Sequence, residues 1–324
     1  GEAAAAADAG NWLEAFVGFR DLLERDPTHA GAIERGAEAA QRLATEHAGQ
    51  LPHAIEVDLI RWFAIREEVG LLATLLDASM VDIPAGWGEM GSDSGRANEE
   101  PVRSVYLDGY SIDRYEVTNA QYDRFLQAVN EKPPAHWDGG HYPTGQADYP
   151  VVGVSWTETA AYCGWLGKRL PTEAEWERAC RGADSLTYPW GGEWDAERAN
   201  MTVYSASTNE ESWTLLSSEA GAATAYPTPV GSYPDGASGY GVLDLCGNAS
   251  EWVADWYDSD AYLHLPAINP IAEEPPWSHA LRGSAWLVYP AAADLVPDLA
   301  RCAHRNAAHT IADPRIGFRC AISR

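Results

Sequence analysis

The chain has 324 residues, and its 48 Asp and Glu against 22 Lys and Arg give a formal net charge of −26. Such an acidic chain repels phosphate backbones and anionic lipid. We therefore expect no nucleic-acid partner. No apolar run is long enough to cross a bilayer, and we expect no membrane span in this chain. The 29 Gly, 20 Pro and 14 Trp are typical of a loop-rich protein.

Residues 1–79 differ in composition from the rest, being rich in Ala, Leu, Glu and Arg with apolar residues at helical spacing. The stretch from Gly10 to Ala30 resembles part of a tetratricopeptide repeat, whose helices need stacked neighbours to bury their apolar faces. Either this helical segment caps a longer array, or its helices pack on the domain that follows, residues 80–324. The sequence opens with Gly-Glu-Ala rather than Met, so we expect upstream domains to be missing from it.

Three helix starts in the second domain are predicted from capping boxes. In a capping box, a hydroxyl side chain and a Glu or Gln three residues later satisfy each other's backbone donors. The three pairs are Thr118 with Gln121, Ser155 with Glu158, and Thr172 with Glu175. The first is followed by an apolar stripe that runs to Val129. The Glu residues of Thr172-Glu-Ala-Glu175 are therefore predicted to cap and pack rather than to form an acid/base pair.

Several motifs follow one another in order between Val81 and Arg324. They are Ile112-Asp-Arg-Tyr-Glu-Val-Thr-Asn-Ala-Gln-Tyr122, the long stretch 149–182, Gly247-Asn-Ala-Ser-Glu-Trp252, Arg282-Gly-Ser284 and Gly317-Phe-Arg-Cys-Ala321. Together they resemble the formylglycine-generating enzyme (sulfatase-modifying factor) family. The resemblance implies an irregular, loop-rich α+β fold related to the C-type lectin fold. A fold does not by itself imply an activity.

The resemblance also implies how the five cysteines are used. In the eukaryotic enzymes of the family, the cysteines at the corresponding positions pair as Cys163 with Cys320 and Cys180 with Cys302, which leaves Cys246 alone. Disulfides persist in secreted or periplasmic proteins, so these bridges predict an extracytoplasmic location. The alternative is a cytoplasmic protein in which the cysteines are small buried hydrophobic residues.

Enzymes of the family carry two further cysteines, after the Arg-Gly-Gly-Ser motif, that bind copper and oxidise a substrate cysteine. In this sequence, Leu287 stands at the first of these positions and Pro297 at the second. Neither side chain is a soft metal ligand or a nucleophile, so we expect no copper site and no formylglycine generation. An oxidoreductase with an unrecognised metal site remains an alternative, because distant residues can assemble a site that no local motif reveals.

Calcium is the cofactor that the resemblance implies, because the family binds it at the Asn-x-x-Glu turn. The expected ligands are the side chains of Asn248 and Glu251, completed by carbonyl oxygens such as those of Cys246 and Ala249. These are the hard oxygen ligands that calcium prefers. Alternatively, Asn248 forms a turn and Glu251 makes local hydrogen bonds.

The expected function is noncatalytic recognition of a protein or small-molecule ligand, with a remodelled groove in place of the active site. Aromatic and arginine residues commonly anchor interfaces. The candidate contacts lie in the segment that forms the active groove of the family enzymes: Trp286, Leu287, Val288, Tyr289, Asp294, Asn306, His309 and Arg315. Core packing is the alternative for each of them, and above all for Trp286.

A second binding hypothesis comes from residues 287–324, which contain no Lys, Glu, Gln, Met or Trp. Every residue type there can be encoded by a codon that ends in a pyrimidine, as happens when the adenines of Asn-type codons are randomised. The pattern resembles the variable proteins of diversity-generating retroelements, many of which use this fold. The alternative function is therefore a diversified binding protein whose variable surface lies at residues around 287–315.

Overall fold

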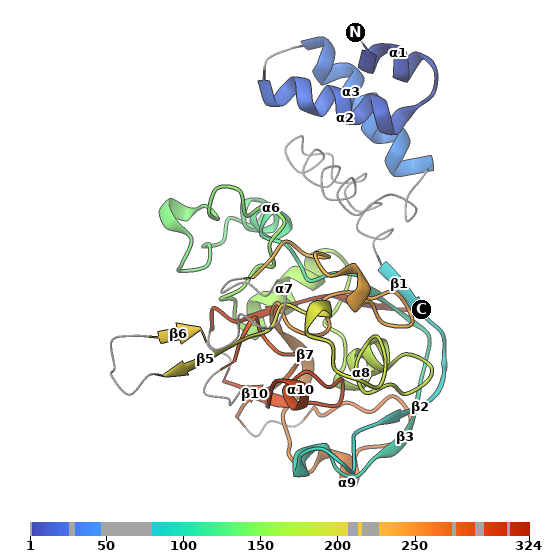
Figure 1. Cartoon of the computed structure of the whole chain (residues 1–324), viewed down its shortest axis with the longest axis vertical. Coiled ribbons are helices and arrows are strands. Elements are labelled where there is room, and N and C mark those ends of the chain that lie inside the picture. The colour runs from blue at the N-terminus through green and yellow to red at the C-terminus, as the bar shows by residue number, and fades with distance from the viewer. Residues whose placement is uncertain are drawn as a thin grey trace. The chain divides into compact units, whose positions relative to one another are not determined.

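The computed structural model describes the following parts of the chain: residues 2–25, 30–46, 80–206, 213–215, 227–273, 277–288, 295–309 and 312–324. The chain divides into two units, Gly1–Met80 and Val81–Arg324. Figure 1 draws the helices of the first unit in blue, and the described strands belong to the second unit apart from Met80, the first residue of β1.

The first unit contains three described helices, α1 (Glu2–Asp8), α2 (Trp12–Arg25) and α3 (Ala30–Glu46). Helices α2 and α3 pack on each other and bury Phe16, Phe19 and Leu43. Gly18 lets α1 approach α2, because a Cβ at that position would lie 2.7 Å from the Cβ of Ala3. The helical prediction therefore holds for residues 2–25 and 30–46, while its second half lies outside the described residues.

Three helices of the second unit begin where the capping boxes predicted. They are α6 (Asn119–Val129), α7 (Trp156–Trp165) and α8 (Glu173–Arg181), and both reciprocal bonds are present in each box. The apolar stripe predicted for α6 was expected to include Val129. This part of the prediction is wrong, because Val129 is 40% exposed. The helix stops there, since Asn130 adopts a left-handed conformation with φ of 56°.

A four-stranded sheet with the order β10-β8-β7-β11 lies at the centre of the second unit. Its strands are β7 (Ser250–Trp256), β8 (His279–Arg282), β10 (Asn306–Ala308) and β11 (Ile316–Phe318). Strand β11 runs parallel to β7, and the other pairs are antiparallel. Strand β10 is therefore an edge strand, and the sheet brings together segments far apart in the sequence.

The remaining strands form smaller sheets at the periphery. One sheet consists of β1 (Met80–Ile83), β4 (Tyr110–Asp113) and β12 (Ala321–Ser323). A two-stranded sheet consists of β2 (Gly86–Met90) and β3 (Arg103–Leu107). The third consists of β5 (Thr202–Ala206), β6 (Trp213–Leu215) and β9 (Leu287–Val288). Figure 1 shows β5 and β6 projecting from the body of this unit. The fold is the predicted α+β arrangement of short elements and long loops.

Short helical turns complete the unit. They are η1 (Ala97–Glu99), η2 (Asp138–Gly140), η3 (Ala196–Arg198), η4 (Pro234–Gly236), α9 (Ala261–His264) and α10 (Val296–Leu299). The segments around η1 and α10 border the groove described below.

Two disulfides join distant parts of the second unit. Cys163 in α7 is bonded to Cys320, which lies between β11 and β12, and Cys180 in α8 is bonded to Cys302, which follows α10. These are the pairs that the resemblance implied. The bridged residues are 157 and 122 positions apart, and loops of that length give about 5 kcal/mol each in the chain-entropy model.

Candidate functional site

A groove of about 430 Å³ lies beside the edge strand β10. Its lining comes from β10, from the turn between β8 and β9, from both sides of α10 and from the loop before β11. Figure 1 shows α10 next to β10 in this view. Leu287, Leu295 and Leu299 give the groove apolar surface, and Asn306 and Arg315 give it polar groups.

The turn between β8 and β9 forms part of the groove and consists of Gly283, Ser284 and Ala285. Gly283 has a φ of 65°, which favours glycine, and a Cβ there would lie 3.3 Å from the Trp176 ring. The hydroxyl of Ser284 donates to the carbonyl of Leu299 at 2.5 Å and ties the turn to α10. Small side chains along this turn leave the space that forms the groove.

Two buried arginines hold the segments that line the groove. Arg282, at the end of β8, donates through Nη1 to the carbonyls of Cys302 and His304, both at 3.0 Å, and through Nη2 to Glu177. Arg305 forms a bidentate pair with Glu173, at 2.7 and 2.8 Å. All four charged side chains are almost fully buried, so helix α8 fixes the position of the loop between α10 and β10.

A second set of charges borders the other end of the groove. Arg301 donates to both carboxylate oxygens of Glu99, at 2.6 and 2.9 Å, and to Asp298 at 2.6 Å. Arg96, which lines the groove, donates to the same Asp298 at 3.1 Å. Burial lowers the pKa of His304, whose Nδ1 lies 3.8 Å from Glu99. The polar end of the groove is therefore held by ion pairs before any ligand binds.

The groove brings together three of the eight predicted contacts, Leu287, Asn306 and Arg315. Leu287 is nearly buried. Asn306 is exposed, and its Oδ1 accepts from the backbone N–H of Ala307 at 2.8 Å. Arg315 forms an ion pair with Asp313 at 2.7 Å.

Three further predicted contacts do not line the groove. Trp286 is half-buried, and its backbone N–H donates to the carbonyl of Asn248 at 2.9 Å. His309 is exposed and contacts the carbonyl of Trp277 through Nδ1 at 3.2 Å. Val288 belongs to β9 and pairs with Val203. The remaining two predicted contacts lie outside the described residues: Tyr289 and Asp294.

Sequence reasoning missed several lining residues, among them Arg96, Leu295, Leu299 and His304. Leu295 and Leu299 are four residues apart, as on one face of a helix, and this spacing was a usable signal. The sequence held no such signal for Arg96, because about 200 residues separate it from Asp298, the ion-pair partner that holds it beside the groove.

The predicted calcium turn is occupied by internal bonds. Arg319 donates to both oxygens of Glu251, each at 2.7 Å, and Trp176 Nε1 donates to Glu251 at 2.9 Å. Asn248 has a φ of 62°, and its Oδ1 accepts from the backbone of Thr228 at 2.8 Å. These side chains do not fit a calcium ion in this arrangement, because binding would require Glu251 to leave Arg319.

The other two expected ligands lie in the same turn. The backbone N–H of Ala249 donates to Glu116 at 2.8 Å, and the side chain of Cys246 points to the carbonyl of Ala300 at 3.2 Å. In the described part of the chain, no group of three or more His, Cys, Asp or Glu side chains is arranged to hold a metal ion. Asn248 forms a turn, as the alternative to a calcium site requires, whereas the bonds of Glu251 are to Arg319 and Trp176, which lie 68 and 75 positions away, and are not local.

Three buried carboxylates share the single guanidinium of Arg319. Burial, together with the negative charges of Asp244 and Glu251, raises the pKa of Glu116 well above its usual range. Burial also raises the pKa of Asp244 to about 6. Sequence reasoning missed Glu116 and Asp244, because they belong to segments that meet only in the fold.

All five cysteines lie among the described residues, and none lines the groove. Four form the two disulfides. Cys246 is a buried free thiol, and burial raises its pKa far above the usual range. Leu287, at the position of the first catalytic cysteine of the family enzymes, lines the groove with an alkyl side chain. The groove thus offers no thiol for metal binding or for nucleophilic chemistry.

Among the described residues, no helix is both long and apolar enough to cross a membrane. Residues 71–324 match the Sulfatase-modifying factor enzyme 1-like domain. The chain therefore belongs to the sulfatase-modifying factor family, as its ordered motifs indicated.

Relatives in this family include both enzymes and an inactive protein. Serine/threonine-protein kinase Pkn1 of Chlamydia trachomatis is 36% identical over 276 residues, which cover 79% of this chain and 40% of Pkn1. The formylglycine-generating enzyme of Thermomonospora curvata is 32% identical, with 75% of this chain and 92% of the enzyme covered. The inactive C-alpha-formylglycine-generating enzyme 2 of mouse is 30% identical, with coverages of 76% and 86%. The chain spans about two fifths of the length of the Pkn1 relatives.

Two solved structures resemble the second unit. PvdO from Pseudomonas aeruginosa has a TM-score of 0.59 and 26% identity, with 76% of this chain and 94% of PvdO covered. Treponema denticola variable protein 1 has a TM-score of 0.55 and 20% identity, with coverages of 76% and 95%. The second likeness concerns the fold alone.

Proposed function

We propose that this chain is a noncatalytic recognition module that binds a protein or small-molecule ligand in the groove beside β10. The observation that carries this proposal is the distribution of the cysteines. The family enzymes work through a pair of thiols, whereas here four cysteines are bridged and the fifth is buried away from the groove. The ion pairs around Arg96 and Arg315 support recognition, because they position polar groups before a ligand arrives.

The module belongs, in this proposal, to a longer extracytoplasmic protein. Two disulfides that each close a loop of more than a hundred residues support an oxidising compartment. The Pkn1 relatives are much longer than this chain, which supports a recognition region attached to a signalling protein. The inactive mouse relative shows that the scaffold also occurs without catalysis.

Two measurements test this function. First, copper-treated protein is incubated with a cysteine-containing peptide, with the Thermomonospora curvata enzyme as a positive control, and formylglycine is sought by mass spectrometry. We expect no conversion above that of copper alone. Conversion at a rate comparable to the control enzyme would refute a noncatalytic role.

Second, peptide and small-molecule libraries are selected on the intact chain, and the selected binders are retested on two variants. Ala307→Phe fills the groove from β10, and we expect it to weaken binding at least tenfold. Ala147→Phe makes the same change outside the groove lining, and we expect it to have no effect. Binders that ignore Ala307→Phe would place recognition elsewhere.

A second candidate is the diversified binding protein. The observation in its favour is that Leu287, Asn306 and Arg315 meet in one groove and all come from the segment without Lys, Glu, Gln, Met or Trp. The gene sequence tests it. An imperfect repeat of this segment nearby, differing at adenines, supports diversification, and its absence together with invariant residues 287–315 across related strains excludes it.

Calcium stays a prediction outside this proposal, because Glu251 is held by Arg319. Titration of chelator-treated protein with calcium tests it: a raised unfolding temperature supports a site, and an unchanged one contradicts it. The oxidoreductase alternative has no metal-binding cluster in its favour within the described residues.

A further inference from the structure

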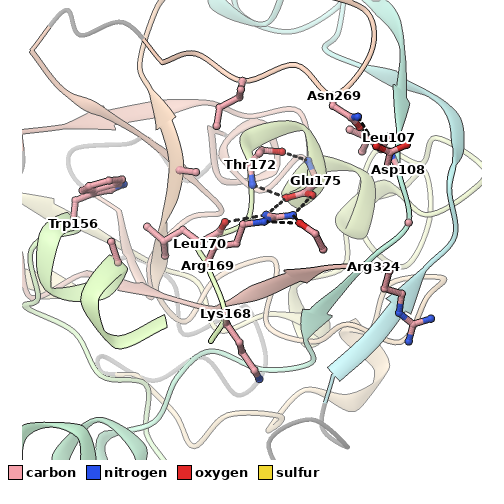
Figure 2. Close-up of a pocket in the computed structure, with 15 residues that line it drawn as sticks. Leu107, Asp108, Trp156, Lys168, Arg169, Leu170, Thr172, Glu175, Asn269 and Arg324 are labelled. Carbon is pink, nitrogen blue, oxygen red and sulfur yellow. Dashed lines mark hydrogen bonds and ion pairs between the residues drawn. The ribbon is translucent and has the colours of Figure 1, made fainter. Parts of the chain in front are cut away.

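A second pocket, of about 530 Å³, shares no lining residue with the groove. Figure 2 shows its arrangement: the ring of Trp156 lies on one side, the Arg169–Glu175 ion pair is in the middle, and Asp108 with Asn269 lies on the other side. Half of its remaining lining is aliphatic and includes Leu170. Its volume is in the range of ordinary small-ligand sites.

All N–H groups of the Arg169 guanidinium donate hydrogen bonds within the protein. Its Nε donates to Ser323 Oγ at 3.1 Å, and its Nη2 donates to the same hydroxyl at 2.9 Å and to Glu175 at 2.7 Å. Its Nη1 donates to the carbonyl of Leu170 at 3.1 Å and to Glu175 at 2.7 Å. An arginine side chain has five N–H donors, and these five bonds use all of them.

The same side chain is nevertheless 37% exposed and lines the pocket. Because its edge is occupied, the surface it offers is its planar face together with its aliphatic stem. An anion would need free N–H donors and would also meet the carboxylate of Glu175. The face of a guanidinium stacks well on aromatic rings. Arg169 is thus prepared for stacking rather than for binding an anion.

Trp156 gives the pocket a rigid aromatic wall. Its Nε1 donates to the carbonyl of Val253 at 2.8 Å, and its ring stacks on His279, with 4.0 Å between centroids and 5° between planes. The ring is half-buried and lines the pocket. Because the indole N–H and one face are engaged and the ring also packs against the core, only the part that lines the pocket offers a ligand apolar aromatic area.

The other cations of the lining are also paired. Lys168 lies 3.0 Å from Asp113, and Arg324 contacts Asp82. The hydrogen bond between Asn269 and Asp108, at 2.8 Å, leaves a polar edge at the far side of the pocket. The pocket thus combines apolar and planar surfaces with paired cations and with the carboxylate of Asp108, which is bonded to the uncharged side chain of Asn269.

We propose that this pocket binds a planar aromatic group with an uncharged edge, carried by a small molecule or by an aromatic side chain of a partner polypeptide. The group lies in the pocket between the Trp156 wall and the face of Arg169. This site is independent of the groove beside β10. A test of ligand binding here therefore does not decide the proposed function of the groove.

The test compares four probes by calorimetry and saturation-transfer NMR on the intact chain. The probes are indole, cyclohexanol, indole-3-acetate and N-acetyltryptophanamide. We expect indole to bind about fivefold tighter than cyclohexanol, the size of effect that cation–π stacking gives. Indole-3-acetate is expected to bind no tighter than indole. Binding of N-acetyltryptophanamide as tight as that of indole assigns a partner's side chain, and binding of indole alone assigns a small molecule.

Two variants locate the binding. Ala160→Phe fills the pocket from a half-buried position of α7 without removing a side-chain hydrogen bond, and indole binding should be lost. Ala307→Phe, the same change in the groove, should leave it unchanged. Thermal unfolding verifies that both variants fold.

Arg169→Lys keeps the charge and removes the planar face, so the preference for indole over cyclohexanol should disappear. If this variant does not fold, the Ala160→Phe result decides. Three outcomes overturn the proposal: equal binding of indole and cyclohexanol, tighter binding of indole-3-acetate, or unchanged indole binding by Ala160→Phe.

Discussion

At the scale of single residues, buried charged side chains of this protein form ion pairs that join distant segments of the fold. Glu251 was a candidate calcium ligand because its motif resembles the family turn, yet both its oxygens bind Arg319. Arg319 follows 68 positions later, and no local pattern in the sequence links the two. A local motif specifies the turn itself, whereas the partner of a buried charge depends on the tertiary fold.

The Glu251–Arg319 pair gives a prediction about stability. Glu251→Gln should lower the free energy of unfolding by about 3–5 kcal/mol, because it leaves a buried guanidinium without its counter-charge. Urea unfolding measures this effect. The matched control is Arg198→Ala, which breaks the exposed pair with Asp195 and should have a much smaller effect, because solvent screens that pair. Equal effects of the two variants would contradict the role given to burial.

A second prediction concerns pH and two buried carboxyl groups. Burial raises the pKa of Asp244 to about 6 and, with the charge of Glu173 adding to it, that of Asp255 to about 7. A raised carboxyl pKa means that the folded state holds the proton more tightly. Its stabilising contribution is complete below the unfolded pKa of about 4 and is lost as pH rises through the folded pKa.

Asp244→Asn tests this pH dependence, because asparagine resembles the protonated acid and its Oδ1 can still accept from Gly231. Between pH 5 and 7.5, the variant should gain roughly 1.4 kcal/mol of stability relative to the natural chain, about one pKa unit of differential proton binding. Chemical unfolding at several pH values measures the difference. A constant difference across this range would show that Asp244 does not have a raised pKa.

At the scale of elements, the sequence predicted those features that depend on residues close together in the chain. The capping boxes predicted the first residues of α6, α7 and α8, because a cap depends on side chains three positions apart. The groove was predicted only in part. Leu287 and Asn306 lie in the segment that the resemblance marked, and His304 lies there too although it was not singled out, whereas Arg96 reaches the groove only through tertiary contacts.

The α8 cap carries a prediction at this scale. Thr172→Ala removes the hydroxyl that accepts from the backbone N–H of Glu175, and it should cost about 1 kcal/mol. Thr172→Ser keeps the hydroxyl and should restore most of that loss. Urea unfolding of the three proteins checks the order, and a serine variant as unstable as the alanine variant would contradict the capping role.

At the scale of the whole molecule, the two disulfides hold together a chain with few long regular elements. The double variant Cys163→Ala with Cys320→Ala should lose about 5 kcal/mol, because the bridge closes a long loop in the unfolded state. Cys246→Ala is the matched control and should cost about 1 kcal/mol, since it removes only a small buried side chain. Similar losses in both variants would mean that the bridge does not contribute as described.

The central claim is that the scaffold keeps the family fold without a thiol available for chemistry. The most direct test uses protein that is purified without a reductant and without a thiol-blocking agent. The thiols that react with a thiol reagent are counted before and after denaturation. We predict none in the native protein and one, at Cys246, after denaturation. A reactive thiol in the native protein, or more than one after denaturation, would contradict the account and reopen a catalytic role for the groove.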